Sequence, residues 1–110
     1  MAINNDKVPE LSEGEFEGFV KEGFVLIDFF AEWCMPCVMM APVIDELSEK
    51  FKGKINFGKI NVDDNQALAQ KFEVRSIPNM ILFKDGKPVE RFVGAVSEDE
   101  LEGKLEGFVG

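Results

Sequence analysis

Two cysteines separated by two residues constrain this chain more than any other feature. Cys34 and Cys37 are the only cysteines in the sequence, and they follow closely on the apolar run 24–30. This spacing lets both thiols lie on one helical turn. A strand that leads into such a helix places the first sulfur where backbone N–H groups and the helix dipole favour a thiolate. We therefore predict a reversible dithiol–disulfide pair rather than a structural crosslink.

The length and composition predict one packed domain. The chain has 110 residues, 45% of them hydrophobic, and it contains eleven phenylalanines. A chain of this length is long enough to bury a core of its own. We expect a single domain over residues 1–110, with residues 1–7 as a loose N-terminal extension.

The charge of the chain limits its chemistry and its partners. Its net charge is -9 and it has no histidine. An acidic balance of this size opposes binding to nucleic acids and to anionic membranes. The lack of histidine excludes histidine-based triads and most zinc or haem ligand sets. The chemistry must therefore rest on thiols, carboxylates, lysines and the backbone, and we expect neither a cofactor nor a metal.

No segment of the sequence has the pattern of a secretion signal or of a membrane span. Residues 1–6 do not combine a basic stretch with an apolar one. The longest apolar runs, 24–30 and 38–44, fall short of the ~20 residues that a membrane helix needs. We therefore expect a cytoplasmic protein. In that compartment, neighbouring cysteines more often serve catalysis or metal binding than structure.

Hydrophobic periodicity and turn residues predict the order αβαβαββα. Ser12 and Ser97 each begin a helix-capping box, and Asp85-Gly86 is typical of a hairpin turn. This order gives a mixed sheet with helices on both faces. The predicted elements are a helix after Ser12, a strand over 24–30, a helix from about Cys34 with Pro42 inside it, a strand over 55–62, a short helix after Asn65, strands over 80–83 and 89–93, and a helix after Ser97.

A set of residues in a fixed order extends over about residues 8–109. It includes Asp28, Ala31-Glu32-Trp33-Cys34, Pro36-Cys37, Pro42, Lys59, Ile77-Pro78, Asp85-Gly86 and Val93-Gly94-Ala95. A Cys-x-x-Cys pair alone is weak evidence because it also occurs in zinc sites, but the whole set is specific, and it resembles the thioredoxin family. The resemblance implies the α/β thioredoxin fold, in which a central mixed sheet has helices on both faces and ends in a β-hairpin and a helix.

The resemblance also implies an activity, the reduction of protein disulfides with electrons from a thioredoxin-reductase-type partner. Cys34 is expected to attack the disulfide of a client protein, and Cys37 to resolve the mixed disulfide. Asp28 lies inside a buried strand, where burial should raise its pKa, and it would accept the proton of Cys37. Lys59 resembles its charge partner. Pro78 is expected to be cis, which exposes the backbone beside it to an extended client chain.

An apolar surface around the two sulfurs is predicted to bind flexible clients. Because methionine is an adaptable contact residue, Met35 and Met80 are predicted to broaden client binding, whereas Met39 and Met40 are predicted to fill the core. The expected members of this apolar surface are Trp33, Met35, Ile77, Pro78, Val93, Gly94 and Ala95.

The sequence departs from the family pattern near the cysteines. Met35-Pro36 stands where Gly-Pro is commonest, and these two residues are predicted to tune the redox potential. Val38 replaces a usual lysine, Asn79 replaces the usual threonine after the proline, and Phe30 stands where many members have a second tryptophan.

Other interpretations stay open at this point. The chain could be an oxidising or isomerising relative, although such domains more often carry histidine where Pro36 stands. It could be a non-catalytic binding module, or it could share a metal at Cys34 and Cys37 with a second copy, a monomer being the default. The side chain of Asp28 could reach a sheet edge, Lys59 could be a surface lysine, and Val93 could belong to the core.

Overall fold

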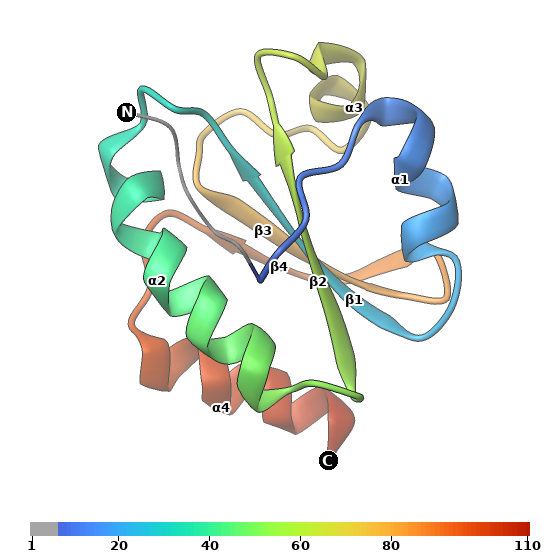
Figure 1. Ribbon diagram of the computed structural model, residues 1–110, viewed down its shortest axis with the longest axis vertical. Helices are drawn as coiled ribbons and strands as arrows, with labels where there is room; N and C mark the ends of the chain where they lie inside the picture. The colour runs from blue at the N-terminus through green and yellow to red at the C-terminus, as the bar shows by residue number, and fades with distance from the viewer. Residues whose placement is uncertain (1–6) are drawn as a thin grey trace.

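A four-stranded mixed sheet forms the centre of the molecule (Figure 1). The structure is a computed structural model and describes residues 7–110, so most of the predicted N-terminal extension lies outside the described residues. The strand order is β2-β1-β3-β4, with β2 parallel to β1 and β3 antiparallel to both β1 and β4. The strands are β1 (Phe24–Phe30), β2 (Ile55–Asn61), β3 (Asn79–Lys84) and β4 (Lys87–Val93). The mixed sheet expected from the sequence is confirmed.

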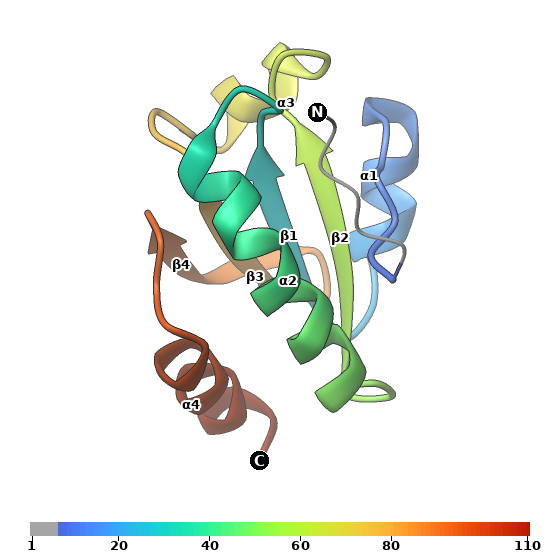
Figure 2. The same cartoon turned by 60° about the vertical axis from the view of Figure 1, so that its left-hand side comes forward.

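Four helices cover the two faces of the sheet within the described residues. In Figures 1 and 2, α2 and α4 lie together on one face, and α1 and α3 lie on the other. Each pair of helices closes its own buried cluster against the sheet. The hairpin and helix expected at the C-terminal end of the fold are confirmed. The helices are α1 (Glu13–Val20), α2 (Met35–Lys50), α3 (Gln66–Lys71) and α4 (Glu98–Val109).

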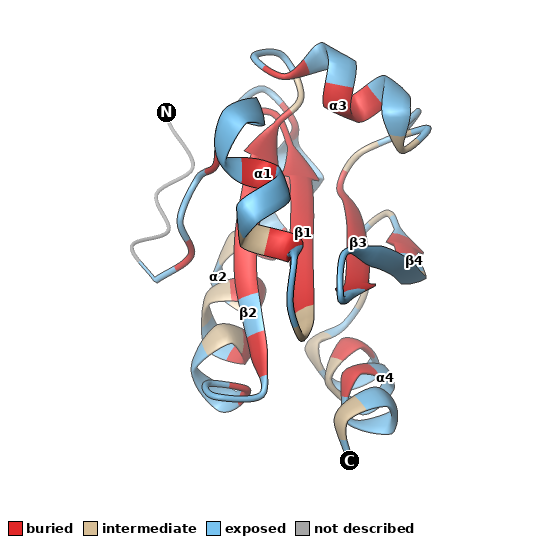
Figure 3. Cartoon of the chain, turned by 90° about the vertical axis from the view of Figure 1, so that its right-hand side faces the viewer, coloured by how far each residue is buried: buried red, intermediate tan, exposed pale blue. Residues whose placement is uncertain are grey.

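Strand β1 is buried on both faces because it lies between β2 and β3 and beneath helices on each side (Figure 3). Successive side chains of a strand point to opposite faces. Val25, Ile27 and Phe29 accordingly join the cluster with α1, and Leu26 joins the cluster with α2. By this alternation Asp28 faces the side of the sheet that α2 covers.

Helix α2 begins directly at the cysteine motif. Cys34 is its N-cap, and a proline follows in the first turn. The apolar stripe predicted for this helix is buried, with Met40, Ile44 and Leu47 each at most 3% exposed. Packing of this stripe on the sheet fixes the direction of α2, and so it fixes the position of the cysteines at its N-terminal end.

Candidate active site

The two cysteines form a disulfide at the start of α2. The backbone N–H of Cys37 donates a hydrogen bond to Cys34 Sγ at 3.2 Å. Both residues are buried, and they cluster with Phe30 and Ala31 at the end of β1. A backbone donor aimed at Cys34 Sγ, together with the positive end of the helix dipole, favours negative charge on that sulfur. The structure thus bears out the sequence interpretation of a bonded pair on one turn.

The peptide bond between Ile77 and Pro78 is cis, as the resemblance implied. The carbonyl oxygen of Ile77 lies 3.8 Å from Cys34 Sγ. On the other side of this loop, the backbone N–H of Gly94 donates to the carbonyl of Pro78 at 2.8 Å. The loop before β3 and the end of β4 are therefore held together beside the sulfur pair.

Asp28 and Lys59 lie opposite each other on the parallel strands β1 and β2. Both side chains are buried, so Asp28 does not reach a sheet edge and Lys59 is not a surface lysine. Burial raises the pKa of Asp28 to about 7, although the positive charge of Lys59 lowers it. Within residues 7–110, Asp28 Oδ1 has no hydrogen-bond partner. The ammonium of Lys59 also lies 5.4 Å from the centre of the Phe30 ring.

Most of the expected apolar surface is exposed around the disulfide, but Pro78 and Met80 are buried and Met39 adds to the surface. Trp33 is 71% exposed, Met35 68% and Val93 54%, so Val93 is not a core residue. Met39 was predicted to fill the core but is 71% exposed, one turn beyond Met35. Met80 was predicted to contact clients but is fully buried in β3. The other members range from buried Pro78 through half-buried Ile77 and Gly94 to exposed Ala95.

Polar contacts made by two side chains near the site were not anticipated from the sequence. The indole N–H of Trp33 donates to a carboxylate oxygen of Asp63 at 2.8 Å. Arg91 on β4 donates to the side chain of Asn79 and to the carbonyl of Phe72. The parallel pairing of β1 and β2 carries a signal for the first contact, because it brings Trp33 and Asp63 to the same edge. Nothing in the sequence pattern indicates the second.

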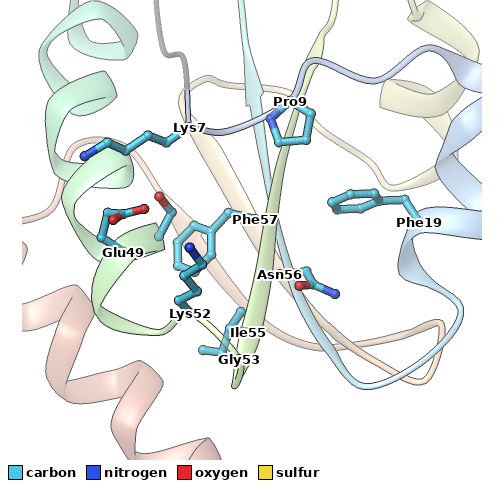
Figure 4. Close-up of a pocket in the computed structure, with 10 residues that line it drawn as sticks. Lys7, Pro9, Phe19, Glu49, Lys52, Gly53, Ile55, Asn56 and Phe57 are labelled. Atoms are coloured by element: carbon cyan, nitrogen blue, oxygen red, sulfur yellow. The ribbon is translucent and has the colours of Figure 1, made fainter.

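A groove of about 430 Å³ lies elsewhere on the molecule, between the C-terminal end of α2 and the outer edge of β2 (Figure 4). Figure 4 shows Glu49 and Lys52 on one side of it and Phe19 on the other. None of the residues that line it belongs to the cysteine site. The groove is therefore separate from the redox chemistry.

Two further structural findings concern residues 7–110. No cluster of three or more histidine, cysteine, aspartate or glutamate side chains in this range is arranged to hold a metal ion. No helix in the same range has the length and apolar character needed to cross a bilayer.

The site can perform dithiol–disulfide exchange. Its two sulfurs make and break a single bond, and the first of them lies beside an open apolar surface on which another chain can rest. An exchange of this kind proceeds by attack of a thiolate on a disulfide sulfur. The fold and the sulfur pair thus define a thiol–disulfide oxidoreductase.

Comparisons with known proteins identify the family. The Thioredoxin family profile matches residues 7–107. A thioredoxin of Staphylococcus saprophyticus is 42% identical over 99 residues, which cover 90% of this chain and 95% of the relative. A thioredoxin of Staphylococcus aureus is 43% identical over 94 residues, which cover 86% of this chain and 90% of the relative. The chain belongs to the thioredoxin family and is a protein-disulfide reductase. Membership implies a reductase that supplies electrons and clients that carry disulfides.

Proposed function

We propose that the protein reduces client disulfides through Cys34 as the attacking thiol and Cys37 as the resolving thiol. One observation carries this assignment of roles. The sulfur of Cys34 receives the N–H of Cys37 at 3.2 Å at the positive end of α2, and it adjoins the exposed Trp33 and Met35. Stabilised as a thiolate and close to the surface, it is the sulfur that a client disulfide can reach.

The proposed reaction has two exchange steps. The thiolate of Cys34 attacks one client sulfur, a bond forms between these two sulfurs, and the other client sulfur leaves as a thiolate that takes up a proton. The thiolate of Cys37 then attacks Cys34 Sγ, which re-forms the disulfide of the protein and releases the second client thiol. The client gains two electrons and two protons, and the protein loses them. A thioredoxin-reductase-type partner returns the electrons.

Asp28 is proposed to accept the proton of Cys37 before the second step, through an intervening water molecule. Its pKa of about 7 lets it hold or release a proton near neutral pH. Its Oδ1 atom has no hydrogen-bond partner among residues 7–110 and is free to accept one. Lys59 would stabilise the carboxylate when it ionises, because the two residues pair across β1 and β2.

The loop with the cis-proline and the apolar surface are proposed to bind the client. The backbone of Ile77 would pair with an extended client segment in the manner of an added strand, next to Cys34. Trp33, Met35 and Val93 would contact apolar side chains of the client without strict sequence requirements. Gly94 and Ala95 would complete this surface, and the buried Pro78 would hold the backbone of Ile77 beside it. Met39 extends it along α2.

We further propose that the protein acts in the cytoplasm as a monomer and binds neither nucleic acids nor membranes. Its net charge of -9 supports the last two points, because it repels polyanions. A reversible cysteine pair is also typical of a reducing compartment.

The assignment of roles is tested by trapping the mixed disulfide. With a disulfide-bonded client, the Cys37→Ser variant should accumulate a covalent adduct of one protein and one client chain, visible by mass spectrometry. The Cys34→Ser variant should form no such adduct. Adducts of equal yield in both variants would contradict the assignment.

A redox titration followed by the fluorescence of Trp33 tests the direction of electron flow. Trp33 is the only tryptophan, the chain has no tyrosine, and its neighbour is Cys34. A two-electron transition at a strongly reducing potential is expected of an electron donor. A far more oxidising potential would favour an oxidant or isomerase instead.

A further inference from the structure

Both arginines of the chain lie beside the loop that ends in the cis-proline. Arg75 lies within this loop and Arg91 on the neighbouring strand β4. Together they line a pocket of about 380 Å³, which we call the arginine pocket. Its other lining residues are Glu73, Ser76, Asn79 and Val93. In a chain with a net charge of -9, this pocket combines two cationic side chains with one carboxylate.

Arg91 is exposed, but hydrogen bonds to the fold hold its guanidinium in place. Its Nη2 atom donates to the carbonyl of Phe72 and its Nη1 atom to Asn79 Oδ1. Asn79 is only 2% exposed, and its amide donates in turn to the carbonyl of Ser76. A guanidinium has five N–H donors, so these two bonds leave others for a ligand. The pocket therefore contains a charged group that is already oriented before a ligand binds.

Arg75 is the more loosely held partner in the pocket, because its ion pair is exposed. Its side chain is 85% exposed and lies 3.6 Å from the carboxylate of Glu73, itself 75% exposed. An exposed ion pair of this kind is weak. A carboxylate from another molecule can therefore replace Glu73 at small cost. The carboxylate of Glu90, the residue before Arg91, accepts the backbone N–H of Arg91.

The arginine pocket is continuous with the apolar surface. Val93 belongs to both, and it lies on the same face of β4 as Arg91, two residues away. Arg75 precedes Ile77 by two residues, a distance of about 7 Å along an extended chain. A client segment that pairs with the backbone of Ile77 would therefore extend to this pocket with the side chains that flank its cysteine.

We propose that the arginine pocket is a specificity subsite that binds an aspartate or glutamate side chain of the client, two or three residues from the client's reactive cysteine. This inference rests on the proposed function, because it needs the client to lie along the Ile77 loop. Arginine matches a carboxylate in shape as well as in charge, since it can donate two parallel hydrogen bonds. The subsite lets a strongly acidic protein act on acidic clients, which its net charge would otherwise repel.

Two disulfide-bonded peptides that differ only by glutamate or glutamine at the flanking position test the subsite. The pre-reduced protein is mixed with each peptide, and the second-order rate constant is followed by the fluorescence of Trp33. We expect the glutamate peptide to react about three-fold to ten-fold faster at low ionic strength, and the difference to shrink at ~0.5 M salt. The Arg75→Gln variant should bring the ratio of the two rates close to one.

Two further variants complete the test. Arg91→Gln also removes a positive charge of the pocket and should lower the ratio of the two peptide rates. If loss of the guanidinium weakens the fold, Arg91→Lys, which keeps the positive charge, is used beside it. Lys104→Gln removes an exposed charge on α4 and should leave the wild-type ratio in place.

The outcomes separate the subsite from the proposed function. Equal rates for the two peptides in the wild type, or a faster glutamine peptide, would overturn the subsite while leaving disulfide reduction intact. A preference that survives both Arg75→Gln and Arg91→Gln would overturn it as well. Failure to reduce either peptide would contradict the proposed function itself.

Discussion

At the scale of single residues, the burial of Asp28 governs its chemistry. Its carboxyl group lies beneath α2, opposite Lys59, and within the described part of the chain one of its oxygens has no hydrogen-bond partner. Loss of solvent raises its pKa to about 7, and the charge of Lys59 only partly opposes this rise. A group suited to proton transfer near neutral pH is therefore also a group that destabilises the fold when it ionises.

The Asp28→Asn variant should be more stable than the wild type at alkaline pH. The carboxyl has a pKa of about 7 in the folded protein and an ordinary value of 3.8. Between these pH values the unfolded chain loses its proton first, so stability falls as the pH rises and stays low above pH 7. The difference between the two pKa values corresponds to ~4 kcal/mol of stability. We expect a smaller gain of about 1–3 kcal/mol at pH 8, because the substitution also removes the charge partner of Lys59. Urea unfolding of the oxidised protein at pH 5 and pH 8 measures it.

The exposed Asp64 provides a control for this experiment. Asp64→Asn should keep the pH dependence of the wild type. If wild type and Asp28→Asn gave parallel stability profiles from pH 5 to pH 8, the raised pKa of Asp28 would be refuted. The same Asp28→Asn variant should also slow the release of the client from the mixed disulfide.

Variants of Met35 and Met39 distinguish apolar contact with the client from tuning of the redox potential. Both are about 70% exposed, so neither supports the core. Met35→Gly should lower kcat/KM for a protein disulfide about three-fold and shift the redox potential by about 30 mV, which corresponds to about 1.4 kcal/mol. Met39 lies outside the ring that the disulfide closes, so Met39→Ala removes only apolar surface. This variant should therefore lower kcat/KM and leave the redox potential unchanged.

Client reduction assays, titration with a glutathione redox buffer and circular dichroism together check this pair of variants. An unchanged potential and unchanged kinetics in Met35→Gly would remove Met35 from both the client surface and the tuning of the disulfide.

At the scale of helices and strands, periodicity explains which predictions succeeded. The continuous apolar run of β1 indicated a strand buried on both faces, and the spacing of Met40, Ile44 and Leu47 indicated the buried stripe of α2. Met39 lies off that stripe, so its exposure follows from helix geometry rather than from its hydrophobicity. Met80 is buried because β3 lies between β1 and β4, and closeness in sequence to the cis-proline does not alter that.

Contacts that depend on how loops meet strands could not be predicted. The bonds from Arg91 to Asn79 and Phe72 require the register of the β3–β4 hairpin together with the path of the loop after α3. Residues this far apart in sequence leave no periodic signal. The cysteine motif and Asp28, in contrast, sit on elements whose pattern is strong, so the sequence was sufficient to anticipate where they lie.

The packing of α1 against β2 depends on a glycine. A Cβ atom added to Gly58 would lie 2.9 Å from side-chain atoms of Leu11 and Phe19. Overpacking of this kind costs roughly 1–3 kcal/mol, and the lower flexibility of alanine in the unfolded chain offsets about 0.5–1 kcal/mol. We expect Gly58→Ala to lower the free energy of unfolding by about 1 kcal/mol.

Gly103 in α4 serves as the matched control, since nothing lies within 4 Å of its added Cβ. Gly103→Ala should raise the free energy of unfolding by up to ~1 kcal/mol through helix propensity. Urea denaturation of both variants distinguishes the signs. A Gly58→Ala variant as stable as the wild type would mean that Leu11 and Phe19 move aside freely.

At the scale of the whole molecule, the order of elements was predictable and the order of strands was not. Alternation of helical and strand patterns indicated αβαβαββα and the hairpin at its end. The sheet order β2-β1-β3-β4 places β1 and β3 in the middle. Because β1 and β3 are antiparallel neighbours, the cysteine loop after β1 and the proline loop before β3 meet at the same end of the sheet. Neither loop alone brings the cysteine pair and the cis-proline together, so the redox site depends on the order of the strands.

The folded molecule should favour its disulfide over its dithiol, and this links stability to redox function. The disulfide closes a short ring, with a sequence separation of 3. In the unfolded chain, closing such a ring costs about 2 kcal/mol of conformational entropy, whereas the fold already holds the two cysteines on one turn. Oxidised protein should therefore resist urea by about 2 kcal/mol more than reduced protein. By the thermodynamic cycle, the redox potential of the pair should be roughly 40 mV more reducing in the folded protein than in the unfolded chain.

Two independent measurements test this link. Urea unfolding with and without dithiothreitol compares the stability of the two redox forms, and glutathione titrations in buffer and in urea compare the redox potentials of the folded and unfolded chain. A variant with both cysteines replaced by serine should have the same free energy of unfolding with and without dithiothreitol. Equal stability of the two redox forms would mean that folding does not contribute to the reducing power of this site.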